Sequence, residues 1–404
     1  MAPSSLQWLD FSEHERRKAN EVIALFQEQD TRDELGIAMV RDAFAELLFP
    51  GTGTMQTRVA YFLFIPWMYL DLESRRVASS EIAARARSIE LRLIDVLASS
   101  SDGAGTIGVQ ARRLLQRLPS SIYWQGLHVW GIRLPPGSQD TYHRSLDACY
   151  TVERRNGRND DGEPIDGTVR RNWHRSLPPS PAGFPKEATF RLRQEDAEYL
   201  REQVLGRMPT SLLAFLLDHP HGAASVDFPW LHPHLEEFPT RLREELHHAR
   251  SFAEVMHGAA LLYNLMLAET ARRDSRIEEY RQALARWHQE IDARQSTLAS
   301  WDRQRLWTIV LHTGARITPQ TRAFIDMWMD LVLSGPGVDD ARARDLIRAR
   351  EVTLKRGQAR LENPRALERW GGASGTRRLN YRWPVATTMI TDLQVGLAAR
   401  GERA

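Results

Sequence analysis

One short segment combines residue types that bind anions with the backbone freedom that such binding needs. In FPGTGTMQTR, two glycines are interleaved with four polar side chains, which are Thr52, Thr54, Gln56 and Thr57. Glycine lets backbone N–H groups approach an anion closely, and a helix that follows presents the positive end of its dipole. The glycine–lysine spacing of a phosphate-binding P-loop is absent. We therefore predict a loop that caps the next helix and leaves Gln56 and Arg58 available to a phosphate or a partner.

A second pattern, at about residues 108–132, has the outline of a helix-turn-helix. The segment QARRLLQRLPSSIYWQGLHVWGI breaks at Pro119 between two helix-forming runs. We expect the second helix to bury an apolar face and to expose a polar one. The side chains expected inside are Ile122, Leu127 and Trp130, and those expected outside are Tyr123, Gln125 and His128. A helical hairpin whose tryptophans simply pack in an all-α core is the alternative interpretation.

The arginines around these patterns suit a DNA groove, where guanidinium groups bind phosphates and an amide reads a base edge. The residues assigned to this contact are Arg58, Arg113, Gln125, His128 and Arg133. A second surface is expected in LERWGGASGTRRLNYRW, where glycines stand beside guanidinium and aromatic groups that suit base stacking. Its contact residues are Arg377, Arg378 and Arg382. A domain-closing turn is the alternative for this segment.

Two further groups could support catalysis or metal binding. His257, Asn264 and Glu269 interrupt the hydrophobic segment FAEVMHGAALLYNLMLAE, and buried polar groups of this kind form either structural networks or active sites. Seven histidines between residues 219 and 257 stand near carboxylates, as zinc ligands do, but H-E-x-x-H or another recognised ligand spacing is absent. We assign no metal site and no cofactor.

The composition is that of a globular protein that can bury a sizeable core. The 404 residues are 42% hydrophobic and 26% charged, with a net charge of +2. The basic side chains are nearly all arginine, since Lys18, Lys186 and Lys355 are the only lysines, and Cys149 is the only cysteine. A disulfide within the chain is thereby excluded. We predict a cytoplasmic protein without membrane segments, because no apolar run is long and uncharged enough to span a bilayer.

Helical periodicity dominates the chain, so the predicted fold class is mainly α. Residues 11–28 and 36–49 read as helices, and Pro66 is expected to kink or break the helix that follows. Residues 151–185 are rich in Gly, Pro, Asp and Arg and read as a loop or linker. The predicted organisation is an N-terminal helical domain at 1–150, containing the helix-turn-helix-like unit, and a larger C-terminal helical domain at 186–404.

Several of these segments resemble recurring blocks of a bacterial family, domain of unknown function 6361. The blocks are SLQWLDFSEHERRKANEVI, DELGIAMVRDAFAELLFPGTGTMQTRVAYFLFIPWMY, PSSIYWQGLHVWGI, HGAALLYNLMLAE and LERWGGASGTRRLNYRW. The resemblance covers nearly the whole chain, and residues 51–58 are its most specific part, although Met55 departs from the expected pattern. The family has no assigned activity. The resemblance implies an accessory protein that works beside DNA-processing partners such as helicases or modification enzymes, for example in antiphage defence.

We therefore predict a non-enzymatic, DNA-associated accessory subunit of a bacterial multi-protein system. One alternative is an enzyme of unrecognised type that uses His257, Asn264 and Glu269, which requires a cleft open to solvent. The other alternative is a protein–protein scaffold that docks its partners through tryptophan surfaces such as Trp67 and Trp124. A scaffold of that kind requires exposed apolar patches.

Overall fold

The computed structural model describes residues 33–156, 171–219, 222, 224–334 and 339–399. Within these ranges the secondary structure is helical. The strand-like pairing in them is one isolated β-bridge between Arg133 and Trp173. The predicted mainly α class is confirmed. The helix predicted at 11–28 lies outside the described residues. No helix in the described ranges has the length and apolar character needed to cross a membrane.

The described chain forms two compact units, and neither is continuous in sequence. Unit 1 combines residues 33–43 with 244–379, and unit 2 combines 44–243 with 380–399. The division falls within two helices, α2 (Ala38–Leu48) and α9 (Thr240–Thr270). The other α-helices of unit 1 are α10 (Asp274–Asp292), α11 (Gln295–Ala299), α12 (Arg303–His312), α13 (Pro319–Ser334), α14 (Ala341–Lys355) and α15 (Pro364–Glu368). Those of unit 2 are α3 (Tyr61–Ser74), α4 (Ile82–Ser99), α5 (Pro119–Val129), α6 (Gln139–Asn156), α7 (Gln194–Arg207), α8 (Leu212–Asp218) and α16 (Trp383–Ala398).

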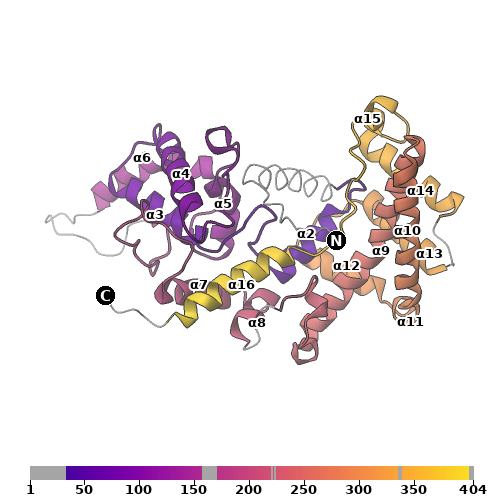
Figure 1. Cartoon of the computed structure of the whole chain (residues 1–404). Helices are drawn as coiled ribbons and strands as arrows, with labels where there is room; N and C mark the ends of the chain where they lie inside the picture. Colours follow the sequence, from indigo (N-terminus) through magenta and orange to yellow (C-terminus); the bar gives the residue numbers. More distant parts are fainter. Residues whose placement is uncertain (1–32, 157–170, 220–221, 223, 335–338, 400–404) are drawn as a thin grey trace, which may run out of the picture. The chain divides into compact units, whose positions relative to one another are not determined.

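Helix α3 is the core helix of the first half of unit 2. Every residue from Tyr61 to Tyr69 is buried, which is expected of a helix that is apolar on all sides and surrounded by others. The ring of Phe62 stacks on that of Trp130, with centroids 3.9 Å apart. The helix runs through Pro66 without a break, contrary to the expectation of an interruption there. Helices α4, α5 and α6 lie around it in Figure 1.

Helix α9 has the corresponding role in unit 1. Its segment 251–268 is almost wholly buried. Trp287 of α10 donates its indole N–H to the carbonyl of Glu254, at 2.7 Å, and Trp328 of α13 donates to the carbonyl of Val255, at 2.9 Å. A Cβ on Gly258 would lie 2.3 Å from the Trp287 ring, so this glycine allows α10 to approach α9 closely. Figure 1 shows α10, α13 and α14 grouped beside α9.

The predicted domain boundaries are corrected by the packing of α16. This C-terminal helix lies along α7, where Gly396 fits against Ala197 and Leu192 (Figure 1). The indole of Trp383 donates to the carbonyl of Val226, at 2.7 Å. Residues 186–243 therefore group with unit 2, whereas the sequence prediction placed them in one continuous domain with 244–404.

The described part of the predicted linker also belongs inside unit 2. Trp173 is buried and donates its indole N–H to the Glu73 carboxylate, at 2.9 Å. The carbonyl of Pro178 accepts the indole N–H of Trp67, at 2.7 Å. Residues 171–185 thus run along unit 2, anchored by the buried Trp173 and Pro178, and do not connect two domains, while 157–170 lie outside the described residues.

The predicted helix-turn-helix-like unit is wrong in its first half. Only Arg112–Leu114 form a single 3₁₀ turn, η1, where a helix was expected. The backbone is turned by Gly105 and Gly108, both with positive φ, and Arg112 itself has a φ of 43°, which is incompatible with an α-helix. The second element is present as α5, in which Pro119 occupies the first turn.

A close approach of α5 to the preceding loop generates a test of this packing. A Cβ on Gly126 would lie 2.4 Å from the carbonyl oxygen of Gly51 and 3.0 Å from the Phe62 ring. We expect Gly126→Ala to lower the free energy of unfolding by roughly 2 kcal/mol, because overpacking outweighs the helix propensity gained by alanine. Gly206→Ala in α7, where nothing lies within 4 Å of the new Cβ, is the control and should be neutral or stabilising. Equal effects of the two in urea unfolding would contradict the close packing.

Candidate functional site

The loop at residues 51–58 is anchored inside unit 2. Gly51 has a φ of 76°, and a Cβ there would lie 2.7 Å from the Trp130 ring. Thr52 and Gln56 are buried, and they bind the carbonyls of Phe49 and Gly51. Of the polar side chains predicted to bind an anion or a partner, these two therefore hold the loop together.

Arg58 is a structural strut. Its Nε lies 2.9 Å from an Asp392 carboxylate oxygen, and its Nη1 donates to the carbonyl of Ala104, also at 2.9 Å. Its guanidinium lies 4.7 Å from the centre of the Phe190 ring. Asp392 also accepts the backbone N–H of Val59, just before α3 begins. The expectation that Arg58 is available to DNA is wrong, because α16 already binds it.

The amides that enter α3 are satisfied by tertiary contacts and not by the predicted threonine cap. The backbone N–H of Thr57 donates to the Tyr123 hydroxyl, at 2.8 Å, and the Thr57 hydroxyl donates to the carbonyl of Gly105, at 2.6 Å. No side chain caps Ala60, the N-cap residue of α3. Thr54 is the exposed member of the predicted polar set.

Helix α5 presents a different face from the one expected. Tyr123 is buried and donates to the carbonyl of Arg58, at 2.9 Å, so its predicted exposure is wrong. Gln125 is exposed as predicted. His128 is half-buried, with Nδ1 3.2 Å from the carbonyl of Arg133.

Arg133 is buried as well. Its guanidinium lies 4.6 Å from the centre of the Trp124 ring and donates to the carbonyls of Trp124 and Pro135. Burial lowers the pKa of this side chain from its usual value. The predicted DNA contact requires an exposed Arg133, and the side chain is not exposed.

A carboxylate of unit 2 itself binds the N-terminus of α5. The buried carboxylate of Glu90, on α4, accepts the Ser120 amide at 2.6 Å and the Ser120 hydroxyl at 2.9 Å. Burial raises the pKa of Glu90 to about 7 despite these hydrogen bonds. A nucleic acid phosphate therefore cannot use this helix end, which is where a helix-turn-helix recognition helix begins its contacts.

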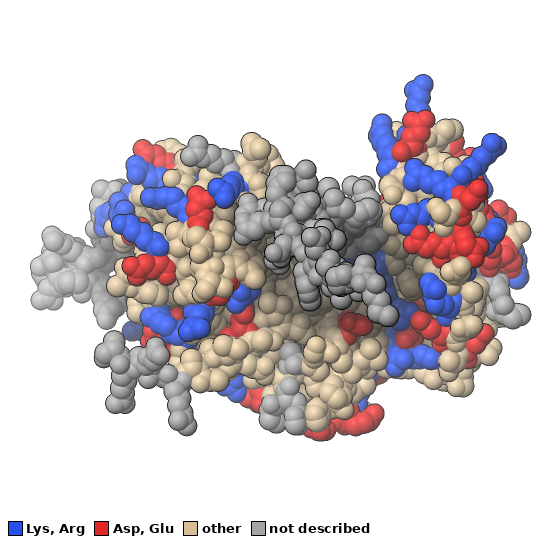
Figure 2. Space-filling view, in the orientation of Figure 1, with Lys and Arg blue, Asp and Glu red and all other residues tan. Residues whose placement is uncertain are grey.

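A basic segment beside α5 remains open to solvent. We call residues 109–117 the basic tip. It contains Arg112, Arg113 and Arg117, and the stretch 103–139 that surrounds it has no Asp or Glu. Arg112 and Arg117 are exposed, whereas the side chain of Arg113 lies outside what the structure describes. The face drawn in Figure 2 carries both signs of charge intermixed.

A shallow pocket of about 360 Å³ lies where the tip meets the 51–58 loop. Its lining residues are Gly53, Thr54, Met55, Arg117, Ser121 and Ile122. Hydroxyl groups and a guanidinium group are donors that a phosphate can use. The exposed Thr54 of the predicted anion loop and the exposed Arg117 thus share one surface.

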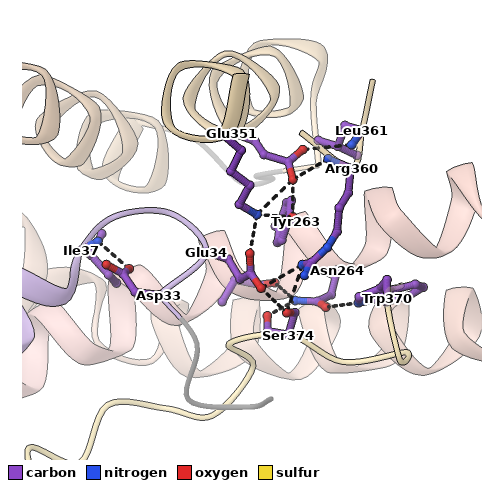
Figure 3. Close-up of polar contacts among 12 residues, drawn as sticks. Asp33, Glu34, Ile37, Tyr263, Asn264, Glu351, Arg360, Leu361, Trp370 and Ser374 are labelled. Atoms are coloured by element: carbon purple, nitrogen blue, oxygen red, sulfur yellow. Dashed lines mark hydrogen bonds and ion pairs between the residues drawn. The ribbon is translucent and has the colours of Figure 1, made fainter. Parts of the chain in front are cut away.

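Unit 1 holds a dense network of charged side chains around Glu34 (Figure 3). The Glu34 carboxylate binds Lys355, Arg360 and Ser374, with the Arg360 contact at 2.8 Å. Burial alone would raise the pKa of Glu34, but the hydrogen bonds from Lys355 and Ser374 and the two positive charges outweigh it and lower the pKa to about 2. The carboxylate is therefore ionised at neutral pH.

The same network includes a second carboxylate, Glu351, which is fully buried. It accepts the Tyr263 hydroxyl at 2.5 Å and the backbone amides of Arg360 and Leu361, at 2.9 and 3.0 Å. Lys355 lies 2.9 Å from the Tyr263 hydroxyl and 3.1 Å from Glu351. All three ammonium protons thus have acceptors, so Lys355 holds the network together and offers no nucleophile.

The three residues predicted to form an enzyme site, His257, Asn264 and Glu269, each bind different partners. Asn264 is fully buried, donating to the carbonyls of Ala260 and Ser374 and accepting the indole N–H of Trp370 (Figure 3). Burial and the charge of Arg378 lower the pKa of His257 to about 4, and its Nε2 lies 3.0 Å from the carbonyl of Thr376. Glu269 pairs with Arg344, at 2.6 Å. These contacts are structural, and they bring no two of the three together.

The predicted C-terminal arginines belong to different units. Arg377 is exposed, whereas Arg378 pairs with Glu290 of α10, and both lie in unit 1. Arg382 lies in unit 2 and donates to Glu46 and to the carbonyl of Thr52, both at 2.5 Å. Arg382 is thereby a second strut of the 51–58 loop.

Histidines of the histidine-rich region also form hydrogen bonds to other groups of the chain. His234 lies 2.8 Å from Glu237, His232 lies 3.0 Å from the carbonyl of Gly222, and His248 accepts the Trp301 indole N–H. In the described ranges, no three His, Cys, Asp or Glu side chains are placed to hold a metal ion. His221 lies outside the described residues.

Sequence reasoning missed two sets of residues. The Glu34–Glu351–Lys355–Arg360 network joins segments more than 300 positions apart, and only the rarity of lysine hinted at Lys355. In the basic tip, Arg113 was among the predicted DNA contacts, but the exposed turn at Arg112–Leu114 was hidden inside a predicted helix. The absence of acidic residues over 103–139 was a signal that could have identified it.

Comparison with known proteins supports the resemblance found in the sequence blocks. The family model described as "Family of unknown function (DUF6361)" matches residues 3–396. No curated protein and no solved structure matches the chain.

The strut role of Arg58 is testable by mutation. We expect Arg58→Ala to lower the free energy of unfolding by about 3 kcal/mol, because it leaves the buried Asp392 carboxylate without its counter-charge. The control is Arg92→Ala, on the exposed side of α4, which should change stability by less than about 0.5 kcal/mol. Thermal or urea unfolding measures the stability of both variants. A loss of stability for Arg58→Ala no larger than that of the control would refute the structural role of Arg58.

The low pKa of Glu34 predicts how acid affects stability. Since the folded pKa, about 2, lies below the ordinary value of 4.5, the ionised carboxylate stabilises the fold above pH 4.5, and this contribution is lost as the pH falls towards 2. Glu34→Gln should cost on the order of 3 kcal/mol at pH 7 and progressively less below pH 4.5. Glu362→Gln, at an exposed ion pair, is the control. A pH-independent difference between wild type and Glu34→Gln would contradict this account.

Proposed function

Since the chain belongs to this family of unknown function, we propose its role from its own residues: unit 2 binds nucleic acid through the basic tip, and the protein is a non-enzymatic, DNA-associated accessory subunit. The observation that carries the proposal is the 37-residue stretch without acidic side chains, 103–139, whose tip exposes Arg112 and Arg117. The family resemblance adds DNA-processing partners, such as helicases or modification enzymes, as the setting.

The electrostatics of the tip favour a polyanion. Arg112 lies 3.9 Å from Asp95, and both side chains are about two-thirds exposed, so this pair is weak and easily exchanged for a phosphate. The other carboxylates near the stretch are already bound, because Glu90 holds Ser120 and Asp102 accepts from Thr189 and the Arg191 amide. The tip therefore keeps its positive charge.

The contact is expected to read the sugar–phosphate backbone and not the base sequence. Helix α5 offers Gln125 and part of His128, but its N-terminus is closed by Glu90 and its arginine, Arg133, is buried. Arginines without a recognition helix bind phosphates of any sequence. Non-specific affinities of this type lie at about 10⁻⁴–10⁻⁶ M at physiological salt.

The two alternatives have less support. An enzyme that uses His257, Asn264 and Glu269 needs an open cleft, and each of these side chains has its own structural partner. A scaffold that docks through Trp67 and Trp124 needs them exposed, and they are only 5% and 6% exposed. Binding through the basic tip needs no change of structure.

A salt series with labelled duplex DNA tests the proposal. We expect fluorescence anisotropy to show binding that weakens with salt, with a logarithmic slope of about −3, because three arginines displace about three counterions. The double substitution Arg112→Ala and Arg117→Ala should reduce this slope by about 2.

The matched control removes two exposed arginines of unit 1, with Arg286→Ala and Arg365→Ala, and should leave the slope unchanged. Absence of binding by the wild type at low salt would exclude the proposal. An equal loss for the control would show that the tip has no special role.

A further inference from the structure

A single apolar side chain projects from the centre of the basic tip. Leu114 is 82% exposed, and among the large hydrophobic side chains in the described ranges none is more exposed. It stands between Arg113 and Arg117 in sequence, on the η1 turn that also contains Arg112. An exposed leucine in a sequence segment rich in arginine is not explained by packing within the unit.

The neighbouring residue shows why Leu114 points outward. The Leu115 side chain packs closely against Gly108 and near Ile94. A Cβ on Gly108 would lie only 2.5 Å from the Leu115 side chain and 3.1 Å from that of Ile94. The carbonyl of Leu115 accepts from Arg87 of α4, at 3.2 Å. With Leu115 held on the inner side, the 3₁₀ turn places Leu114 on the outer side.

The base of the tip is also held by the core of the unit. The Tyr61 hydroxyl accepts the amide of Ile107, at 3.0 Å, and the carbonyls of Ala104 and Gly105 bind Arg58 and Thr57. The backbone turns sharply at Gly108, whose φ is 87°. The projecting leucine is thus presented by an anchored turn, so little conformational freedom is lost when it meets a partner.

We propose that Leu114 is a wedge that enters between base pairs while the flanking arginines hold the phosphates. Apolar side chains that partly unstack a base step, with basic residues beside them, are a known means of kinking duplex DNA from the minor groove. The inference rests on the proposed function and adds to it a deformation of the DNA. Pyrimidine–purine steps, which unstack most easily, are the expected sites.

The pocket beside the tip fits the same geometry. It brings Arg117 together with the hydroxyl-bearing Thr54 and Ser121 at the edge of the tip. A phosphate next to a wedged step can bind there while Leu114 contacts the bases. Anionic lipid would satisfy the same charges, but stable membrane attachment requires more apolar surface than one leucine supplies.

The experiment uses the full-length protein and a duplex with 2-aminopurine at a TA step, whose fluorescence rises when the base unstacks. We expect the wild type to raise the fluorescence several-fold at saturation. Leu114→Ala should lose most of that rise while keeping the salt dependence of anisotropy-measured binding, because the arginines remain. Leu311→Ala, at an exposed leucine of unit 1, is the matched control and should behave as the wild type.

The outcomes separate the two proposals. Wild-type binding without a rise in fluorescence, or a rise that Leu114→Ala retains, overturns the wedge and leaves DNA binding standing. No binding by the wild type overturns both. Leu114-dependent sedimentation with phosphatidylserine vesicles, without any effect on 2-aminopurine, overturns the wedge in favour of a lipid surface.

Discussion

Buried indole rings that also donate a hydrogen bond are the interaction on which both units depend. The eleven tryptophans within the described ranges are all buried, and ten of them donate their N–H to a carbonyl or a side chain of another segment. A buried N–H without an acceptor costs about 1–3 kcal/mol, so each ring is confined to the place where its acceptor lies. Each tryptophan thereby fixes the position of a second segment as well as filling volume.

Several arginines likewise donate hydrogen bonds to groups of other segments. The arginines used in this way are not available to bind a ligand at the surface. Arg58, Arg133 and Arg350 bind backbone carbonyls inside their own units. Their positive charges stabilise irregular segments that have no helix to satisfy the carbonyl groups. These three arginines therefore add little charge to the surface, although the composition counts them as basic residues. The basic tip differs because the side chains of its Arg112 and Arg117 are exposed and, in the described part of the chain, not bound to backbone carbonyls.

The sequence indicated what kind of fold this is but not how its parts are joined. Amphipathic and wholly apolar runs identified the helices, since helical periodicity is a local property. The division of the chain depended on α16 binding α7 and on Asp392 meeting Arg58, which are long-range contacts that no local pattern reports. The exposure predicted for Arg58, Tyr123 and Arg133 was wrong for the same reason, because these residues look like surface residues until their distant partners are known. Gln125 was correctly placed because the helical period alone decides its exposure.

The ion pair between Arg58 and Asp392 spans 334 positions, and it sets an order of events on the ribosome. By the time residue 243 has been made, unit 2 still lacks its last helix, and about 140 further residues must be added before α16 begins. At about 5–20 residues per second, this delay is on the order of ten seconds. During this delay the side of α7 that α16 later covers is exposed, and Arg58 lacks its carboxylate partner. A newly made chain therefore carries an incomplete unit 2 while unit 1 is being synthesised, and this interval is when chaperones and proteases can act on it.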